Sequence, residues 1–158
     1  MIKPNIGISD KSLDSITEIL TKVLSDEMIL YVMTRKFHWN VSGESFMELH
    51  KLFQAQYEQM EESIDQVAER INQLGGNTIG TMKEFLEQST IEEHPGVYPA
   101  KKAMITELLI NNEIMTRLLR KSIDECSNKY KDAVSADLLT TILGQHETIA
   151  WILRRYSN

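Results

Sequence analysis

Cysteine, proline and glycine are scarce in this sequence, which has one, three and seven of them in 158 residues. The single cysteine, Cys126, cannot form an intrachain disulfide, which fits a reducing compartment and gives no support to a thiol-based redox site. No apolar run approaches the roughly 18 residues that a membrane span needs. The first residues lack the basic start and apolar core of a signal peptide, so we expect the mature chain to begin at Met1. These absences predict a cytoplasmic protein that does not enter a membrane.

Basic residues are also few at the two ends of the chain. The formal net charge is −6, whereas binding to nucleic acid phosphates depends mainly on clustered lysine and arginine. The first eleven residues offer only Lys3 and Lys11 against Asp10, and the last five offer Arg154 and Arg155. We therefore expect the surface to attract cations, and we expect DNA binding to be weak.

Helical periodicity is what the sequence does contain. Apolar residues recur at three- and four-residue steps in four stretches, and no alternating strand pattern competes with them. These stretches cover about residues 10–38, 44–74, 100–126 and 134–156. Ser9 or Ser12 can cap the first predicted helix, and Gly75-Gly76 ends the second. The sequence predicts an all-α four-helix bundle that forms a single domain over residues 1–158.

The connection between the second and third predicted helices is long and irregular. It runs from about residue 77 to residue 99 and contains a short helical pattern near residues 82–87. In a four-helix bundle, a connection of this length can carry the chain from one end of the bundle to the other. We therefore expect the third long helix to start at the same end as the second.

Four residues with metal-binding side chains fall at informative spacings. His38 lies just before the turn between the first two helices and His50 lies just after it, so the two imidazoles can come together. Asp65 and Glu69 are four residues apart on the second helix and can chelate a cation from one face. Mixed nitrogen and oxygen ligands suit iron or zinc better than magnesium or calcium. The sequence predicts a transition-metal site made of these two pairs.

One chain cannot close this site. His50 and Glu69 are nineteen residues apart on one helix, a separation of roughly 28 Å. If two copies of the second helix pair antiparallel about a two-fold axis, position 50 meets position 69 and position 54 meets position 65. Such a contact creates two equivalent sites, each with two histidines from one subunit and two carboxylates from its partner. The spacing therefore predicts that oligomerisation completes the site.

Other interpretations compete with the shared site. Taken alone, a histidine at a helix end or a glutamate on a solvated face is more often structural than functional. An internal di-iron centre of the usual bundle type needs Glu-x-x-His on two helices, and none of the four histidines has a glutamate three residues before it. His94 and His146 lack comparable partners in the sequence, and we interpret both as surface or structural residues.

A set of short motifs adds a family resemblance. The motifs are His38-Trp39-Asn40-Val41-x-Gly43, then Phe46 and Leu49-His50, and later Asp65-x-x-Ala68-Glu69-Arg70 followed by Leu74-Gly75-Gly76. With them the chain resembles the Dps family (DNA-binding protein from starved cells) of ferritin-like mini-cages. The match extends over the whole length, including the short helix between helices two and three. The resemblance implies a ferritin-like four-helix bundle assembled into a dodecameric hollow shell.

The resemblance also implies a chemistry. Members of the family bind Fe(II) at subunit interfaces, oxidise it preferentially with hydrogen peroxide and store a ferric mineral, which protects against oxidative stress. Four residues match the family ferroxidase ligands, namely His38, His50, Asp65 and Glu69. Trp39 matches the family tryptophan beside the site, which is thought to take part in electron transfer, although core packing explains a tryptophan there equally well.

One position departs from the family pattern. Four residues after the second histidine the family usually has Asp, sometimes Glu, and this chain has Gln54. An amide oxygen can bind a hard cation but brings no negative charge, so we expect one iron to bind and a second to bind weakly. Glu58 lies one turn further on and, with Glu61 and Glu62, flanks the proposed two-fold axis. These glutamates can replace part of the missing charge, although solvated helix residues explain them as well.

Some functional assignments stay open. Asp132 and Asp137, near the start of the fourth helix, are candidates for the iron-uptake pores that the resemblance implies at three-fold axes, and ordinary helix N-terminal acids explain them equally well. A DNA-binding nucleoid-protection protein with weak or no ferroxidase activity is an alternative function. A bundle that serves only as a scaffold or binding module is another.

Overall fold

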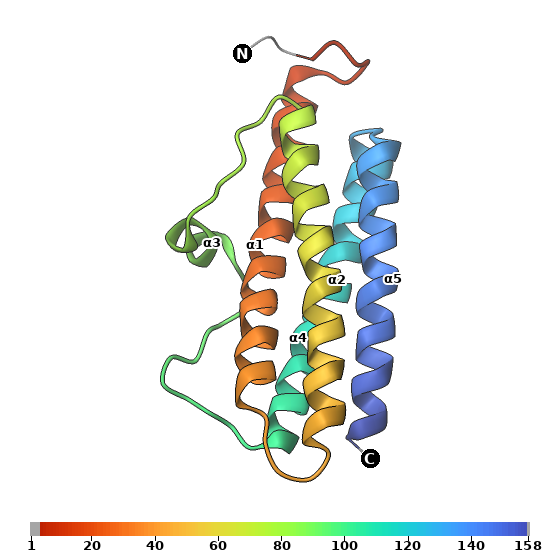
Figure 1. Cartoon of the computed structure of the whole chain (residues 1–158). Coiled ribbons are helices and arrows are strands. Elements are labelled where there is room, and N and C mark those ends of the chain that lie inside the picture. The colour runs from red at the N-terminus through yellow and green to blue at the C-terminus, as the bar shows by residue number, and fades with distance from the viewer. Residues whose placement is uncertain (1–3, 158) are drawn as a thin grey trace.

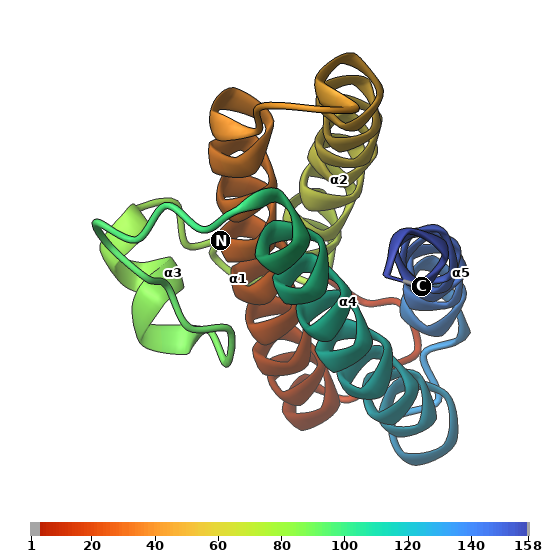
Figure 2. The ribbon, with the colours of Figure 1, turned by 90° about the horizontal axis from the view of Figure 1, so that it is seen from below.

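The computed structural model describes residues 4–157, and within that range it contains helices and no strand. Four long helices form the bundle: α1 (Asp10–Asn40), α2 (Phe46–Gln73), α4 (Lys101–Asp124) and α5 (Ala133–Tyr156). The short helix α3 (Met82–Gln88) lies beside α1, on the side away from α5 (Figure 1, Figure 2). This arrangement confirms the predicted all-α bundle with a short extra helix between the second and third long helices.

The first two helices begin and end at residues with clear local causes. The Ser9 hydroxyl accepts a hydrogen bond from the Ser12 amide at 3.2 Å and caps α1. After α2, Gly75 adopts φ +85°, and the Gly76 amide bonds back into the last turn of the helix at 3.0 Å. A side chain at Gly75 would be strained at that φ and would place its Cβ 2.8 Å from Cδ of Pro4. The predicted end of the helix at Gly75-Gly76 is confirmed.

Residues 77–99 cross the length of the bundle, as the sequence predicts. They leave α2 beside the start of α1, pass through α3 and reach α4 at the end where α2 begins (Figure 1). Asp26 of α1 is fully buried and accepts hydrogen bonds from the Thr90 amide at 2.5 Å, the Thr90 hydroxyl at 2.7 Å and the Ser89 hydroxyl at 2.7 Å. A buried carboxylate without such partners is costly, so the crossover and α1 stabilise each other.

Helix α4 continues into a π-helical turn, Glu125–Lys129, before the chain reverses into α5. The polar run at residues 127–129 indicates a loosening of the helix, and the backbone there widens, with the Tyr130 amide bonded to the Glu125 carbonyl at 3.0 Å. Lys131 then adopts φ +58° to complete the reversal. Cys126 is buried inside this turn, and burial raises the pKa of its thiol to about 12. The thiol therefore stays protonated near neutral pH.

The core is apolar over most of its length and is formed by all four long helices. Its fully buried side chains include Phe37, Phe53, Leu108, Met115 and Leu139. Burial of such side chains is the main stabilising contribution to a bundle of this size. None of the described helices is long and apolar enough to cross a membrane.

One polar cluster interrupts this core. His146 of α5 is 2% exposed, with Nε2 2.7 Å from Oε1 of Glu27 in α1 and Nδ1 2.8 Å from Oδ1 of Asn112 in α4. The Asn112 amide nitrogen donates to the Leu108 carbonyl at 2.7 Å, which turns its oxygen toward the histidine, so Nδ1 of His146 carries a proton. His146 is thus a structural residue that joins three helices, as interpreted from the sequence, whereas the sequence does not predict its partners.

Candidate metal centre

The turn between α1 and α2 brings His38 and His50 face to face. Within it, Gly43 adopts φ +85° and Ser45, which precedes α2, adopts φ +65°. The two imidazole rings stack with their centroids 3.7 Å apart and their planes 19° apart. The structure therefore brings the two histidines together across the turn, as their spacing predicts.

Reciprocal hydrogen bonds hold both rings. Nδ1 of His38 lies 2.8 Å from the carbonyl oxygen of His50, and Nδ1 of His50 lies 2.9 Å from the carbonyl oxygen of His38. Because a carbonyl oxygen only accepts, each Nδ1 donates, and each Nε2 of a neutral ring keeps its lone pair. Backbone carbonyls commonly orient metal-binding imidazoles in this way. The pair is therefore suited to bind a cation through two Nε2 atoms.

A group of aromatic rings around one arginine adjoins the histidines along α1 and α2. Tyr57 meets the His38 ring edge-on at 5.3 Å, and Tyr31 meets Tyr57 edge-on at 6.1 Å. The Arg35 guanidinium lies 4.8 Å from the Tyr57 ring centre and 5.4 Å from that of Trp39, and it donates a hydrogen bond to the Tyr31 hydroxyl at 2.5 Å. Trp39 is 63% exposed, so packing in the core of this chain does not explain it.

Asp65 and Glu69 lie on the exposed face of α2, away from the histidines. Asp65 lines a hollow of about 610 Å³ between α1 and α2, together with Glu58, Glu61 and other residues. Among residues 4–157 of this chain, no three His, Cys, Asp or Glu side chains gather closely enough to hold a metal ion. The chain thus presents a nitrogen pair near one end of α2 and a carboxylate pair in the other half of that helix.

Gln54 lies one turn beyond His50 on α2 and is half-buried. Its amide nitrogen donates a hydrogen bond to Oε1 of Glu58 at 2.7 Å. The carbonyl oxygen of Gln54 is therefore the atom left to bind a cation, and it is neutral. The negative charge of Glu58 lies one hydrogen bond away, which supports a partial replacement of the charge that an aspartate at position 54 would bring.

The two acidic residues at the start of α5 differ in their surroundings. Asp132 is 2% exposed, caps α5 by accepting from the Val134 and Ser135 amides, and pairs with Arg70 through both oxygens at 3.0 and 3.1 Å. Burial alone would raise the pKa of Asp132, but the hydrogen bonds from Ser135 and Arg70 outweigh it and hold the pKa below its ordinary value. Asp132 therefore serves as a helix cap with its carboxylate turned into the chain, and its pore role stays a prediction. Asp137 is exposed.

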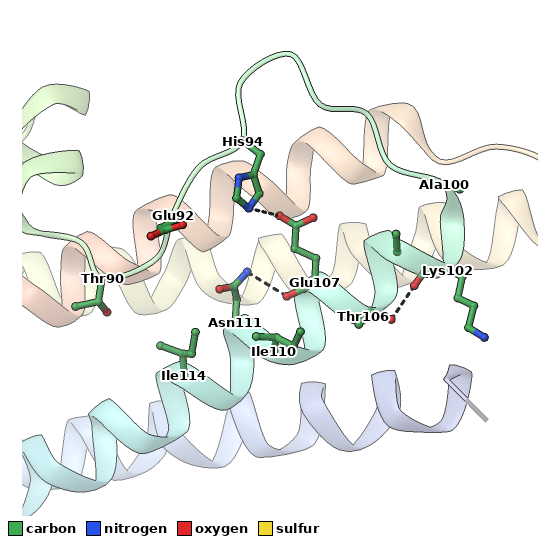
Figure 3. Close-up of a pocket in the computed structure, with 11 residues that line it drawn as sticks. Thr90, Glu92, His94, Ala100, Lys102, Thr106, Glu107, Ile110, Asn111 and Ile114 are labelled. Atoms are coloured by element: carbon green, nitrogen blue, oxygen red, sulfur yellow. Dashed lines mark hydrogen bonds and ion pairs between the residues drawn. The ribbon is translucent and has the colours of Figure 1, made fainter.

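A groove of about 770 Å³ lies between the crossover and α4 (Figure 3). His94 of the crossover points toward Glu107 of α4, with Nε2 and Oε1 3.6 Å apart (Figure 3). The apolar side chains of Ile110 and Ile114 also line the groove. His94 is half exposed and has this one carboxylate partner at the surface, in keeping with its interpretation as a surface residue.

Both the sequence and the fold match proteins of a known family. Residues 17–158 match the family model of the ferritin-like domain. DNA protection during starvation protein 2 of Bacillus anthracis is 34% identical over 143 residues, which are 90% of this chain and 97% of that protein. The chain belongs to the Dps family of the ferritin-like superfamily.

The likeness to other proteins extends over nearly the whole Dps-family chain. DpsC from Streptomyces coelicolor aligns with a TM-score of 0.94 at 27% identity and covers 99% of this chain and 90% of that one. An uncharacterized low temperature-induced protein of Nostoc is 38% identical over 156 residues, which are 99% of this chain and 87% of that protein. The Dps fold thus accounts for the four long helices and for the crossover between α2 and α4.

Proposed function

We propose that this Dps-family protein stores iron and oxidises Fe(II), preferably with hydrogen peroxide, at sites shared between two subunits of a cytoplasmic dodecamer. Such a ferroxidase would protect the cell against oxidative stress. Membership of the family supports the broader role in iron storage or DNA protection. The finer proposal is carried by one observation: His38 and His50 keep two Nε2 atoms for a cation at one end of α2, far from the exposed carboxylates of the same subunit.

A two-fold contact between subunits completes the site in this proposal. Antiparallel pairing of two copies of α2 about an axis between positions 59 and 60 brings each histidine pair to the partner's carboxylates at positions 65 and 69. The same contact covers the exposed indole of Trp39, which adjoins His38 in the sequence. A large exposed aromatic side chain is a frequent component of protein interfaces. Exposed Trp39 therefore supports an interface at this end of α1.

Each side chain has a defined task toward the substrate ion. His38 and His50 bind Fe(II) as neutral ligands oriented by backbone carbonyls. Asp65 and Glu69 supply the negative charge that draws the cation in and favours the ferric product. Gln54 adds only a neutral oxygen, so a second iron binds weakly. Zn²⁺ suits the same ligands and, being redox-inert, would occupy the site as a substitute without turnover.

Complementation between two inactive variants tests the sharing of the site. We expect His38→Ala/His50→Ala subunits and Asp65→Ala/Glu69→Ala subunits to be inactive when each assembles alone. In a randomly mixed shell half of the dimers are mixed, and each carries one intact site, so about a quarter of the wild-type rate should return. Fe(II) oxidation by peroxide under anaerobic conditions measures the rate. If the mixed shells stay as inactive as their parents, the two halves do not belong to one shared site.

Two further variants sharpen this test. Gln54→Asp adds the missing carboxylate, and we expect calorimetric titration to show a second cation bound about tenfold or more tightly than in the wild type. Lys83→Gln, on the exposed surface of α3, is a matched control that leaves the proposed ligands untouched and should keep the wild-type rate. An unchanged second binding step in Gln54→Asp would contradict the role given to this position.

DNA protection is the second candidate function, because relatives carry that name. The net charge of −6 and the few basic residues near either end weigh against it. A gel-shift titration at low salt should show no supershift, and a clear one would raise nucleoid protection above iron oxidation.

Exposed Asp137 remains our candidate for a pore that admits the cation, and Asp137→Asn should slow iron uptake without changing assembly.

A further inference from the structure

Hydrogen peroxide needs more electrons than one bound Fe(II) can supply. This inference rests on the proposed function. Reduction of hydrogen peroxide to water takes two electrons, whereas one Fe(II) supplies one electron as it becomes Fe(III). Gln54 brings no charge for a second iron, so a site with one bound iron needs another electron donor nearby. Without one, peroxide cleavage by a single Fe(II) releases hydroxyl radical.

Two tyrosines are in position to supply that electron. Tyr57 meets the ring of the ligand His38 edge-on, with an interplanar angle of 78° and centroids 5.3 Å apart. Tyr31 meets Tyr57 in the same way, at 87° and 6.1 Å. The rings of His38, Tyr57 and Tyr31 thus make two successive contacts, which run from the ligand histidine along α1 and α2 toward the acidic hollow that Tyr31 lines.

Arg35 and the acidic hollow prepare Tyr31 to lose an electron and a proton. The Arg35 guanidinium donates a hydrogen bond to the Tyr31 hydroxyl oxygen at 2.5 Å. Because guanidinium only donates, the Tyr31 O–H proton points elsewhere and can leave, while the bond from Arg35 is kept. Tyr31 lines the hollow together with Glu58, Glu61 and Glu62, so solvent and carboxylates are at hand to take the proton.

We propose that Tyr57 and Tyr31 form an electron-donor pair that supplies the second electron when peroxide meets a single bound Fe(II). Fe(II) gives one electron and becomes Fe(III). Tyr31 gives one electron through Tyr57 and releases its phenol proton to solvent, becoming a phenoxyl radical. The peroxide O–O bond breaks, and two electrons and two solvent protons convert it to two waters. A later Fe(II) reduces the radical, with uptake of one proton, and restores the tyrosine.

Trp39 is a weaker donor on this geometry. Among the described residues, the Trp39 indole contacts the Arg35 guanidinium at 5.4 Å and stacks on neither histidine ring. The Arg35 guanidinium lies over the rings of Tyr31, Trp39 and Tyr57 alike, at 5.4, 5.4 and 4.8 Å, so this cation does not distinguish the three donors. We assign the lasting radical to Tyr31, whose oxygen keeps a hydrogen bond and whose proton has an exit.

A single-turnover experiment on the assembled protein tests the pair. Shells loaded with one Fe(II) per subunit receive one equivalent of hydrogen peroxide without oxygen and are frozen for electron paramagnetic resonance, with a spin trap in a parallel sample. We expect a tyrosyl signal in the wild type, its loss in Tyr31→Phe/Tyr57→Phe, and a several-fold rise in trapped hydroxyl radical in that variant. Phenylalanine keeps both rings, so packing is preserved. Tyr98→Phe, at a 68% exposed tyrosine, is the matched control and should behave as the wild type.

The outcomes separate this inference from the proposed function. A tyrosyl signal that survives in Tyr31→Phe/Tyr57→Phe overturns the donor pair. The donor pair is also overturned if the wild type gives no tyrosyl signal and oxidises two irons for each peroxide. If that oxidation still depends on His38 and Asp65, the proposed function stands. Iron oxidation that does not depend on His38 and Asp65 overturns both.

Discussion

Replacing His146 by leucine should destabilise the protein more than replacing any other histidine. His146 is 2% exposed and Glu27 is fully buried, and the two join at 2.7 Å in the interior. The other carboxylate oxygen of Glu27 has no hydrogen-bond partner among the described residues. His146→Leu therefore leaves a buried carboxyl group with no partner on either oxygen.

The size of the effect follows from this geometry. Removing one partner of a buried carboxyl–imidazole contact leaves the carboxyl group uncompensated in the interior, which costs about 3–5 kcal/mol. For a domain of this length, each kcal/mol lowers the midpoint of thermal unfolding by about 2–4 °C, so His146→Leu should lower it by about 6–20 °C. Glu27→Leu leaves only the Nε2 atom of a neutral imidazole without a partner, and it should cost about 1–3 kcal/mol. Glu27→Leu/His146→Leu removes both polar groups and should recover much of the loss.

Differential scanning calorimetry at one fixed protein concentration is the assay, because the proposed assembly would make the midpoint depend on concentration. His94→Leu is the matched control: its Nε2 lies 3.6 Å from Glu107 at a half-exposed position, and it should change stability by less than about 1 kcal/mol. If His146→Leu and Glu27→Leu/His146→Leu lost equal stability, the cost would come from packing and not from an unpaired Glu27. That result would refute the reasoning.

Three further predictions concern other buried groups. Asp26→Ala removes the acceptor for the Thr90 amide and hydroxyl, and we expect about 1–3 kcal/mol less protection of that amide against hydrogen exchange. The pKa of Asp132 is lower in the folded state than in the unfolded state. Asp132 therefore stabilises the fold above the unfolded pKa near 3.8, and this stabilisation is lost as the pH falls through the folded pKa. Asp132→Asn should flatten the acid side of a curve of unfolding free energy against pH. Because burial raises the pKa of Cys126 to about 12, iodoacetamide at pH 8 should alkylate it only after denaturation, as read by mass spectrometry.

The helices and the turn that pairs the histidines follow from local sequence. Apolar residues at three- and four-residue steps bury one face of a helix, and this rule places all four long helices to within a few residues. Gly75, with φ +85°, marks the end of α2 because other residues rarely adopt that conformation. His38 and His50 are twelve residues apart, on either side of a single turn, so the contact between their rings also follows from local sequence.

The same local rules do not identify partners that are distant in the chain. Glu27 and His146 are 119 residues apart, and neither belongs to a motif that points to the other. The acidic residues at the start of α5 look alike in the sequence, yet Asp132 is held inside by Arg70, 62 residues away, while Asp137 is exposed. Burial and pairing of this kind depend on how the helices face one another.

By itself, the sequence determined that this chain is a helical bundle and that residues 50 and 69 cannot meet within one chain, because helix rise is a constant of the backbone. Only the tertiary structure decided which nitrogen of each imidazole is free, since that depends on the carbonyl oxygens that the turn sets against His38 and His50. It also decided that Tyr57 and Tyr31 continue from the His38 ring. Contacts between side chains on two helices depend on the rotation and register of both helices, and no single stretch of sequence contains that information.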